Sequence, residues 1–136
     1  MANEIDPKFG SMITLQFSKA NPAANATTDL TFPQGGAGFL VPEGFVFHPV
    51  CLHGESNADL TAGTATFKVT TDGDELAKGP APVLSDEVQA ASAVVRVGVE
   101  PIAAGEVVGV SVTTAATYAP NTADVDAVLI GYLVPA

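Results

Sequence analysis

The sequence predicts an all-β protein, and three observations carry this prediction. The 13 glycines and 10 prolines are spread along all 136 residues, so every stretch with a helical i, i+3, i+4 pattern is soon interrupted. Hydrophobic and polar residues alternate over several short segments, which is the period of a strand with one buried face. Turn signals such as Asp72-Gly73 separate these segments. About eight short antiparallel strands separated by turn signals predict a β-sandwich or a barrel.

The first predicted strand covers residues 11–17. Its apolar face carries Ile13, Leu15 and Phe17, and its other face carries Met12, Thr14 and Gln16. Short apolar segments at residues 30–32 and 39–41 predict two further strands. They flank a glycine-rich turn at residues 35–38, where glycine permits positive φ angles.

Residues 45–53 predict a longer strand with two partly buried faces. Strict alternation places Phe45, Phe47, Cys51 and His53 on one face, and Val46, Val50 and Leu52 on the other. Pro49 has no N–H group to donate to a neighbouring strand, so it predicts a sheet edge or a bulge. His48 would face away from Cys51 and His53 unless Pro49 changes the register.

Four further strands are predicted in the second half of the chain. They cover residues 65–71, 91–99, 107–114 and 124–134, and Arg96 lies opposite the valine face of the second of these. The last strand is nearly continuously apolar after Ala127. A local helical turn is the alternative at residues 85–91, where Ser85 precedes two acidic residues as an N-cap would.

The charge distribution limits the classes of partner. Fifteen acidic and five basic residues give a net charge of −10. The basic residues stand singly along the chain, at Lys8, Lys19, Lys68, Lys78 and Arg96. Without a basic patch we expect no nucleic-acid partner and no anionic membrane surface. A run long enough to cross a membrane is also missing from the sequence.

Metal ligands are too few for a closed site within one chain. His48, Cys51 and His53 form the densest group, but a structural zinc site needs four ligands and the sequence has no second group of cysteines and histidines. We therefore expect no metal in a single chain, while a site shared between symmetry-related chains stays open.

Two acidic segments have a simpler interpretation than calcium binding. Asp72, Asp74 and Glu75 surround Gly73 but lack the remaining oxygen positions of a calcium loop, so they predict a turn. Asp124 and Asp126 predict the solvated start of a strand. Motifs for nucleophilic, phosphate-binding or zinc-dependent catalysis are absent from the sequence. We expect no enzyme, no catalytic residues and no cofactor.

Three stretches of residues 39–136, with the glycine just before them, carry a resemblance to a known family. They read GFLVPEGFVFHPVCLHGES, GTATFKVTTDGDEL and VRVGVEPIAAGEVVGVSVTTAATYAPNTADVDAVLIGYLVPA. In their strand and turn order and their Thr/Val/Gly-rich style, they resemble the jelly-roll proteins of tailed-bacteriophage virions, especially head-decoration and head-fibre proteins. The resemblance implies a homotrimer that binds the major capsid protein on the outer capsid surface and stabilises the shell.

The same resemblance gives the domain division, and the high apolar content of this short chain gives an expected interface. Residues 1–10 are expected to form an N-terminal arm that reaches the capsid or a neighbouring subunit, and residues 11–136 a single β-sandwich domain. The residues expected at subunit or capsid contacts are Ile5, Phe9, Met12, Phe39, Phe45, Tyr132, Leu133 and Val134. The alternative function is a receptor- or carbohydrate-binding module of a phage tail or fibre, in which the acidic segments would bind calcium.

Overall fold

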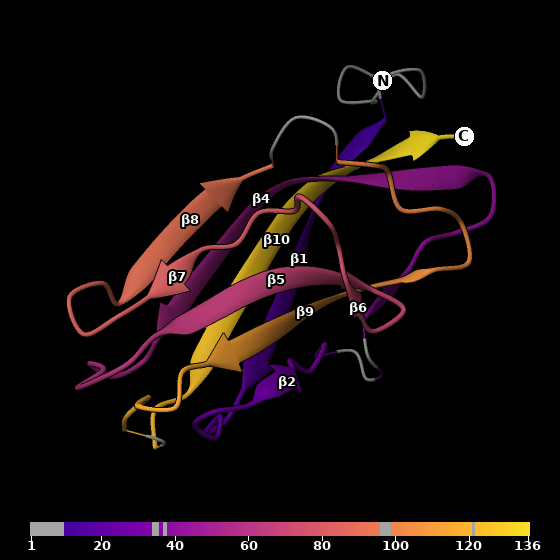
Figure 1. The fold of residues 1–136 in the computed structure, drawn as a ribbon. Coiled ribbons are helices and arrows are strands. Elements are labelled where there is room, and N and C mark those ends of the chain that lie inside the picture. The colour runs from indigo at the N-terminus through magenta and orange to yellow at the C-terminus, as the bar shows by residue number, and fades with distance from the viewer. Residues whose placement is uncertain (1–9, 34–35, 37, 96–98, 121) are drawn as a thin grey trace.

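The computed structural model describes residues 10–33, 36, 38–95, 99–120 and 122–136, and these residues form ten strands and no helix (Figure 1). The strands are β1 (Ser11–Lys19), β2 (Thr27–Asp29), β3 (Phe39–Leu40), β4 (Phe45–Ser56), β5 (Ala65–Thr71), β6 (Asp74–Glu75), β7 (Val83–Leu84), β8 (Ala90–Val94), β9 (Val107–Thr114) and β10 (Val125–Pro135). The predicted all-β class is confirmed. In these ranges there is consequently no helix long and apolar enough to span a membrane.

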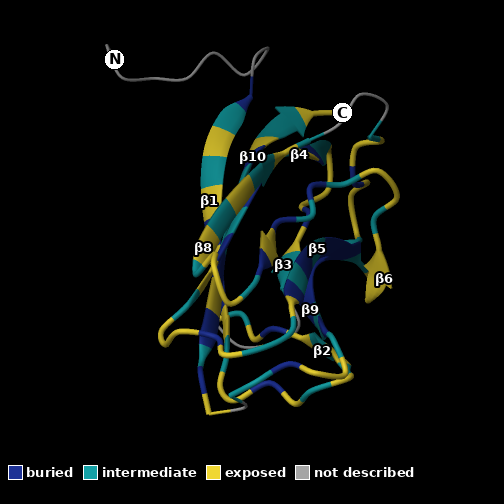
Figure 2. Ribbon diagram, turned by 60° about the vertical axis from the view of Figure 1, so that its left-hand side comes forward, coloured by how far each residue is buried: buried dark blue, intermediate teal, exposed yellow. Residues whose placement is uncertain are grey.

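The strands form two antiparallel sheets, which Figure 2 shows as two layers. The first sheet has the order β1-β10-β4-β8. In the second sheet β9 and β5 are central; β2 and β3 both pair with β9, while β6 and β7 both pair with β5. Each of these pairs of short strands thus forms one interrupted edge. The arrangement is a β-sandwich whose strand order is consistent with a jelly roll.

The hydrophobic core lies between the two sheets. Its largest fully buried side chains include Phe17, Phe47 and Phe67. Burial of side chains of this size contributes about 1.5–3 kcal/mol each. Buried valines and leucines complete the core, among them Leu15, Leu52, Val69, Val108, Val110, Val112, Val125 and Leu129.

Two glycines make room for the phenylalanine rings. A Cβ atom on Gly54 of β4 would collide with the ring of Phe67 on β5, so this glycine lets the two sheets approach. A Cβ atom on Gly131 of β10 would collide with the ring of Phe47 on the neighbouring strand β4. Both positions therefore depend on the missing side chain rather than on a special backbone angle.

A β-bulge in β4 changes the predicted arrangement of its side chains. Ile130 pairs with Cys51 whereas Gly131 pairs with Pro49, which leaves Val50 as the extra residue. Phe47 points into the core before the bulge, and Leu52 does so after it. The prediction that Phe47 shares a face with Cys51 and His53, and Val50 with Leu52, is therefore wrong. Pro49 correctly predicted a bulge in this strand. The extra residue Val50 is the reason that the faces change.

Smaller differences concern the connecting segments. The second strand lies at Thr27–Asp29 rather than at residues 30–32, although the Leu30 N–H continues its pairing by donating to the Val110 carbonyl. The alternative of a helical turn at residues 85–91 is wrong, because Ser85 and Val88 exchange backbone hydrogen bonds in a tight turn that leads into β8.

The turn at Asp72-Gly73 is confirmed. Both residues have positive φ angles, 51° and 88°, as a two-residue hairpin turn requires. Residues 1–9 of the expected arm lie outside the described residues. The same holds for Arg96 and for residues 35 and 37 of the glycine-rich turn.

Candidate interaction surface

The outward face of the first sheet gathers apolar side chains from all four strands. The register aligns Met12 with Tyr132, and it aligns Ile130 with Cys51 and Val94. We call this surface the apolar face; it consists of Met12, Val46, Cys51, Val94, Val128, Ile130, Tyr132 and Val134. The alternation of inward and outward residues places these side chains on the side away from the core.

Several side chains of the apolar face are open to solvent. Val94 is 71% exposed, Met12 55% and Tyr132 37%. Exposed and half-buried residues alternate along β8 and along the first half of β1 in Figure 2. Large apolar side chains that cluster on a surface mark a site of contact with another macromolecule more often than scattered ones do. Tyrosine is moreover a residue type that frequently anchors such contacts.

Charge is confined to one end of this sheet face. Asp126 pairs with Glu55 across β10 and β4, next to Ser18 on β1 and Ala90 on β8. Partial desolvation raises the pKa of the Asp126 carboxyl, and the neighbouring carboxylates of Glu55 and Asp124 raise it further. The acidic end thus contains carboxylates that repel one another, while the rest of the face carries no Asp, Glu, Lys or Arg among the described residues.

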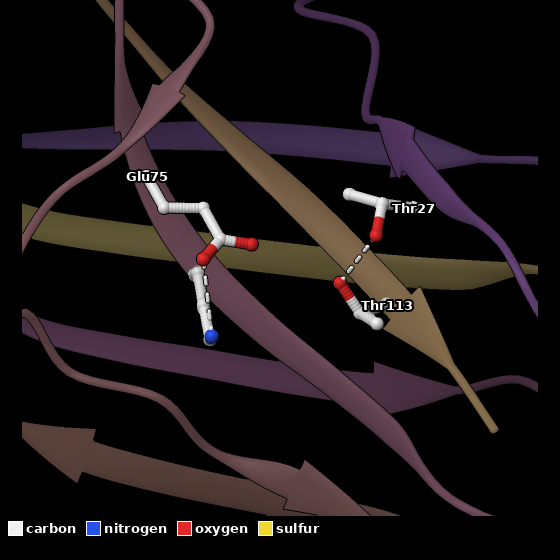
Figure 3. A network of polar contacts seen from close by, with 4 residues as sticks. Thr27, Glu75 and Thr113 are labelled. Carbon is white, nitrogen blue, oxygen red and sulfur yellow. Dashed lines mark hydrogen bonds and ion pairs between the residues drawn. The ribbon is translucent and has the colours of Figure 1, made fainter.

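The outward face of the second sheet has the opposite chemistry. Thr27, Thr113 and Thr66 form a row across three strands, and the hydroxyl oxygens of Thr27 and Thr113 lie 2.9 Å apart in a hydrogen bond (Figure 3). Glu75 forms an ion pair with Lys68, with 3.1 Å between Nζ and Oε2. We call this surface the hydroxyl face, and it includes Thr27, Thr66, Thr70, Ser111 and Thr113. Of these side chains Thr27 is exposed and Thr66 and Thr113 are half-buried, whereas Thr70 and Ser111 are buried.

The residues expected at contacts occupy three different environments. Met12, Tyr132 and Val134 lie on the apolar face. Phe39, Phe45 and Leu133 are partly buried and pack against the core, and the Phe39 ring lies 6.3 Å from that of Phe47. Ile5 and Phe9 lie outside the described residues. An interface role for these residues stays a prediction.

Sequence reasoning missed five members of the apolar face. Val46, Cys51, Val94, Val128 and Ile130 lie in nearly continuous apolar runs, where the sequence does not show which side faces the core. Strand alternation from Tyr132 would have identified Ile130 and Val128, because they precede Tyr132 by two and four residues.

The bulge places His48, Cys51 and His53 on the same side of β4. His53 Nδ1 lies 2.6 Å from Ser92 Oγ, and its Nε2 lies 3.6 Å from Glu55 Oε2. Within the described ranges there is no group of three or more histidine, cysteine or acidic side chains placed to hold a metal ion. The Ser-His-Glu set has the residue types of a hydrolase triad, but it lies on an open sheet face, where His53 and Glu55 side chains are 36% and 54% exposed. The set consists of one surface hydrogen bond between His53 and Ser92, with Glu55 at ion-pair distance from His53.

The acidic segments are occupied by contacts within the chain. Asp72 Oδ1 accepts a hydrogen bond from the Val107 N–H at 2.8 Å, and Asp124 Oδ1 accepts one from the Asn21 N–H at 3.2 Å. Glu75 is paired with Lys68. These carboxylates therefore fasten turns to neighbouring strands, which explains their positions without a cation.

Comparisons with known proteins add one finding about the fold. No family model matches the chain, and no curated protein matches it. Among solved structures, the chain is similar to a chain of the "Cyanophage Pam1 capsid asymmetric unit", with a TM-score of 0.55 and 18% sequence identity. The similarity covers 99% of this chain and 93% of that chain. The two chains thus have similar lengths and share a fold almost from end to end.

Proposed function

We propose that this chain is a structural protein of a bacteriophage virion, which decorates the outer surface of the capsid and stabilises it. The observation that carries the proposal is the nearly complete similarity in fold to a chain of a cyanophage capsid asymmetric unit. The sequence resemblance to head-decoration proteins points independently in the same direction. The role is structural rather than catalytic.

The apolar face is the surface through which we propose that the chain docks on the major capsid protein. Removal of Met12, Tyr132 and Val94 from water would contribute about 25 cal/mol for each Å² of apolar surface buried. The chain as a whole carries a net charge of −10, so it favours a partner surface that is neutral or basic. The hydroxyl face then lies on the side away from the shell.

The oligomeric state follows from the resemblance. Decoration proteins of this type are usually trimers, and we propose a homotrimer for this chain. A three-fold contact joins two different patches of neighbouring copies, so each copy would contribute both of them.

A capsid-binding experiment tests the docking role. The purified chain is mixed with undecorated capsids of the same virus, and the bound fraction is measured by co-sedimentation at several salt concentrations. We expect Tyr132→Glu to weaken binding at least tenfold, because it places a charge in the centre of a desolvated contact. The control Thr113→Glu adds the same charge to the hydroxyl face and should bind like the wild type.

Two results would contradict the proposal. One is a wild-type chain that does not co-sediment with capsids at any salt concentration. The other is a specific glycan that binds in a glycan array, with or without calcium, because this would favour the receptor- or carbohydrate-binding alternative. A heat-release assay adds a functional readout, since decorated capsids should keep their contents at a higher temperature than undecorated ones.

A further inference from the structure

The four edges of the sandwich differ in how open they are to another strand. Both edges of the second sheet are interrupted, because β2, β3, β6 and β7 have only two or three residues each. The β8 edge of the first sheet has five residues. The remaining edge is β1, which is nine residues long. Short or broken edge strands are the usual protection against unwanted strand pairing, and β1 lacks this protection.

The backbone groups that β1 leaves open can be assigned from its pairing. Ser18 exchanges two hydrogen bonds with Thr31 on the side away from β10, at 3.1 and 2.8 Å. Residues two apart in a strand direct their N–H and C=O groups to the same side, so Gln16, Thr14 and Met12 also direct theirs away from β10. Within the described residues, β1 pairs only with β10 and, at Ser18, with Thr31. The unused groups therefore belong to Met12, Thr14 and Gln16.

The sequence and the surroundings of this edge favour an added strand. Residues 11–18 contain no charged residue and no proline, the two residue types that most often block an edge. All three side chains at the open positions are exposed. A hollow of about 190 Å³, lined by Thr14, Gln16, Phe32 and Pro33, lies beside the edge. The residues that the structure describes leave this space unfilled.

We propose that β1 pairs with β1 of a second copy of this chain, antiparallel and across a two-fold axis that passes beside Thr14. In this register Thr14 faces Thr14 of the other copy, and Met12 of each copy faces Gln16 of the other. Each pair exchanges N–H···O=C bonds both ways, so the open groups of both edges are used completely. A shift by one pair to either side leaves some of them without a partner.

Charge and side-chain chemistry support a second copy as the occupant. Two chains with a net charge of −10 repel each other, and the uncharged segment 11–18 lets them approach without opposing carboxylates in the contact. Threonine pairs directly across antiparallel strands are favourable. On the inner side the half-buried Ile13 would lie opposite Leu15 of the other copy, which removes more apolar surface from water.

This contact is distinct from a trimer interface. A two-fold contact uses the same patch on both copies, whereas a three-fold contact uses two different patches. The β1 pair would therefore join two monomers in solution, or one trimer to the next. For monomers its signature is a doubling of the mass, and for trimers it is a doubling where all three β1 edges of one trimer pair with those of a second.

Sedimentation velocity of the full chain over a range of concentrations tests the pairing. We expect the wild type to double in mass, and Thr14→Pro to weaken the doubling at least tenfold. Proline removes the N–H and places its ring at the open edge, but β10 does not use that N–H, so the sandwich should still fold. Thr14→Val keeps the N–H and is the matched control, which should double like the wild type. Thermal unfolding of both variants verifies their folding.

The register is tested by pulsed electron paramagnetic resonance in a C51S background. A nitroxide label at T14C should lie close to its symmetry mate, whereas labels at Q16C should be about 14 Å farther apart along the strands, because four residues of about 3.4 Å separate them. A wild type that never doubles, a doubling that Thr14→Pro leaves unchanged, or a T14C distance no shorter than the Q16C distance would overturn the proposal.

Discussion

The hydroxyl group of Tyr118 is an exception among the buried polar atoms of this protein. The side chain is only 4% exposed, and its hydroxyl oxygen has no hydrogen-bond partner among the described residues. Burial raises the pKa of the phenol, because it disfavours the charged phenolate. A buried hydroxyl without a partner costs about 1–3 kcal/mol of desolvation.

We predict that Tyr118→Phe stabilises the fold by about 1 kcal/mol at neutral pH, because it removes the unpaired hydroxyl and keeps the ring. The raised pKa also gives a pH dependence. Above the ordinary pKa of tyrosine, the unfolded chain releases the phenolic proton before the folded chain does, so the wild type loses stability as the pH rises. The phenylalanine variant should lose less over the same range.

Urea unfolding at pH 7 and at pH 10–11 measures both effects for Tyr118. A phenylalanine variant that is less stable than the wild type at neutral pH would show that the hydroxyl makes a stabilising bond.

The carboxyl of Asp126 also bears a cost in the folded state. Partial desolvation and the carboxylates of Glu55 and Asp124 raise its pKa, so the ionised form is less favourable in the folded chain than in the unfolded one. The penalty is fully present above the raised pKa and disappears below the ordinary pKa of aspartate.

We therefore predict that Asp126→Asn raises stability at pH 7 by at most about 1 kcal/mol, since the site is largely solvated. The gain should shrink as the pH falls through the acidic range, and Asp59→Asn, an exposed loop position, is the control for the change in net charge. Thermal unfolding between pH 3 and pH 7 provides the comparison. A gain that stays constant with pH would contradict this explanation.

At the scale of the strands, the alternation of residue types was sufficient where a strand is regular. It predicted β1 and β5 with their inward faces, and it located β9 and β10. It failed in β4, because the extra residue Val50 reverses which side chains after it face the core. The pattern of apolar residues alone does not reveal such a bulge. Among the short strands the sequence located β3 but placed β2 three residues too late and missed β6 and β7, since their positions depend on pairing with β9 and β5.

The contact between Gly54 and Phe67 is the place where the two sheets depend on a single missing side chain. We predict that Gly54→Ala destabilises the fold by about 1–3 kcal/mol, because the Phe67 ring must move within a closely packed core. Gly79→Ala is the control, since its Cβ would meet only the backbone oxygen and side chain of Leu76, at 3.3 Å or more.

The double variant Gly54→Ala/Phe67→Leu isolates this contact. A smaller side chain at position 67 should make the alanine less harmful, so the two effects should not add. Strict additivity in urea unfolding would argue against a direct contact.

At the scale of the molecule, the two outward faces explain why the candidate surface was predicted only in part. Met12 and Tyr132 were identified as large apolar residues near the chain ends. Val94 and Ile130 join them only through the register of four strands, which residues from distant parts of the sequence determine together. The interaction surface is thus a property of strand order, and a pattern within one segment does not show it.

The high net charge gives opposite salt dependences to the two proposed contacts. Pairing of two acidic copies through β1 should strengthen between 50 and 500 mM NaCl, because salt screens their repulsion. Docking on a basic capsid surface should weaken over the same range. Sedimentation of the chain alone and co-sedimentation with capsids measure the two trends. Dissociation of the β1 pair with added salt would contradict a contact without charged residues.

The interrupted edges of the second sheet also decide where growth of an assembly ends. Once two β1 strands have paired, the longest strand still open at the rim of either sandwich is the five-residue β8, and the rest are fragments of two or three residues. A further copy therefore has no long edge strand with which to form backbone hydrogen bonds. Proteins with long exposed strands risk open-ended fibres at high concentration. Strand addition at each β1 edge therefore stops after one partner, so a single copy gains one neighbour and a trimer, with its three β1 edges, gains at most three.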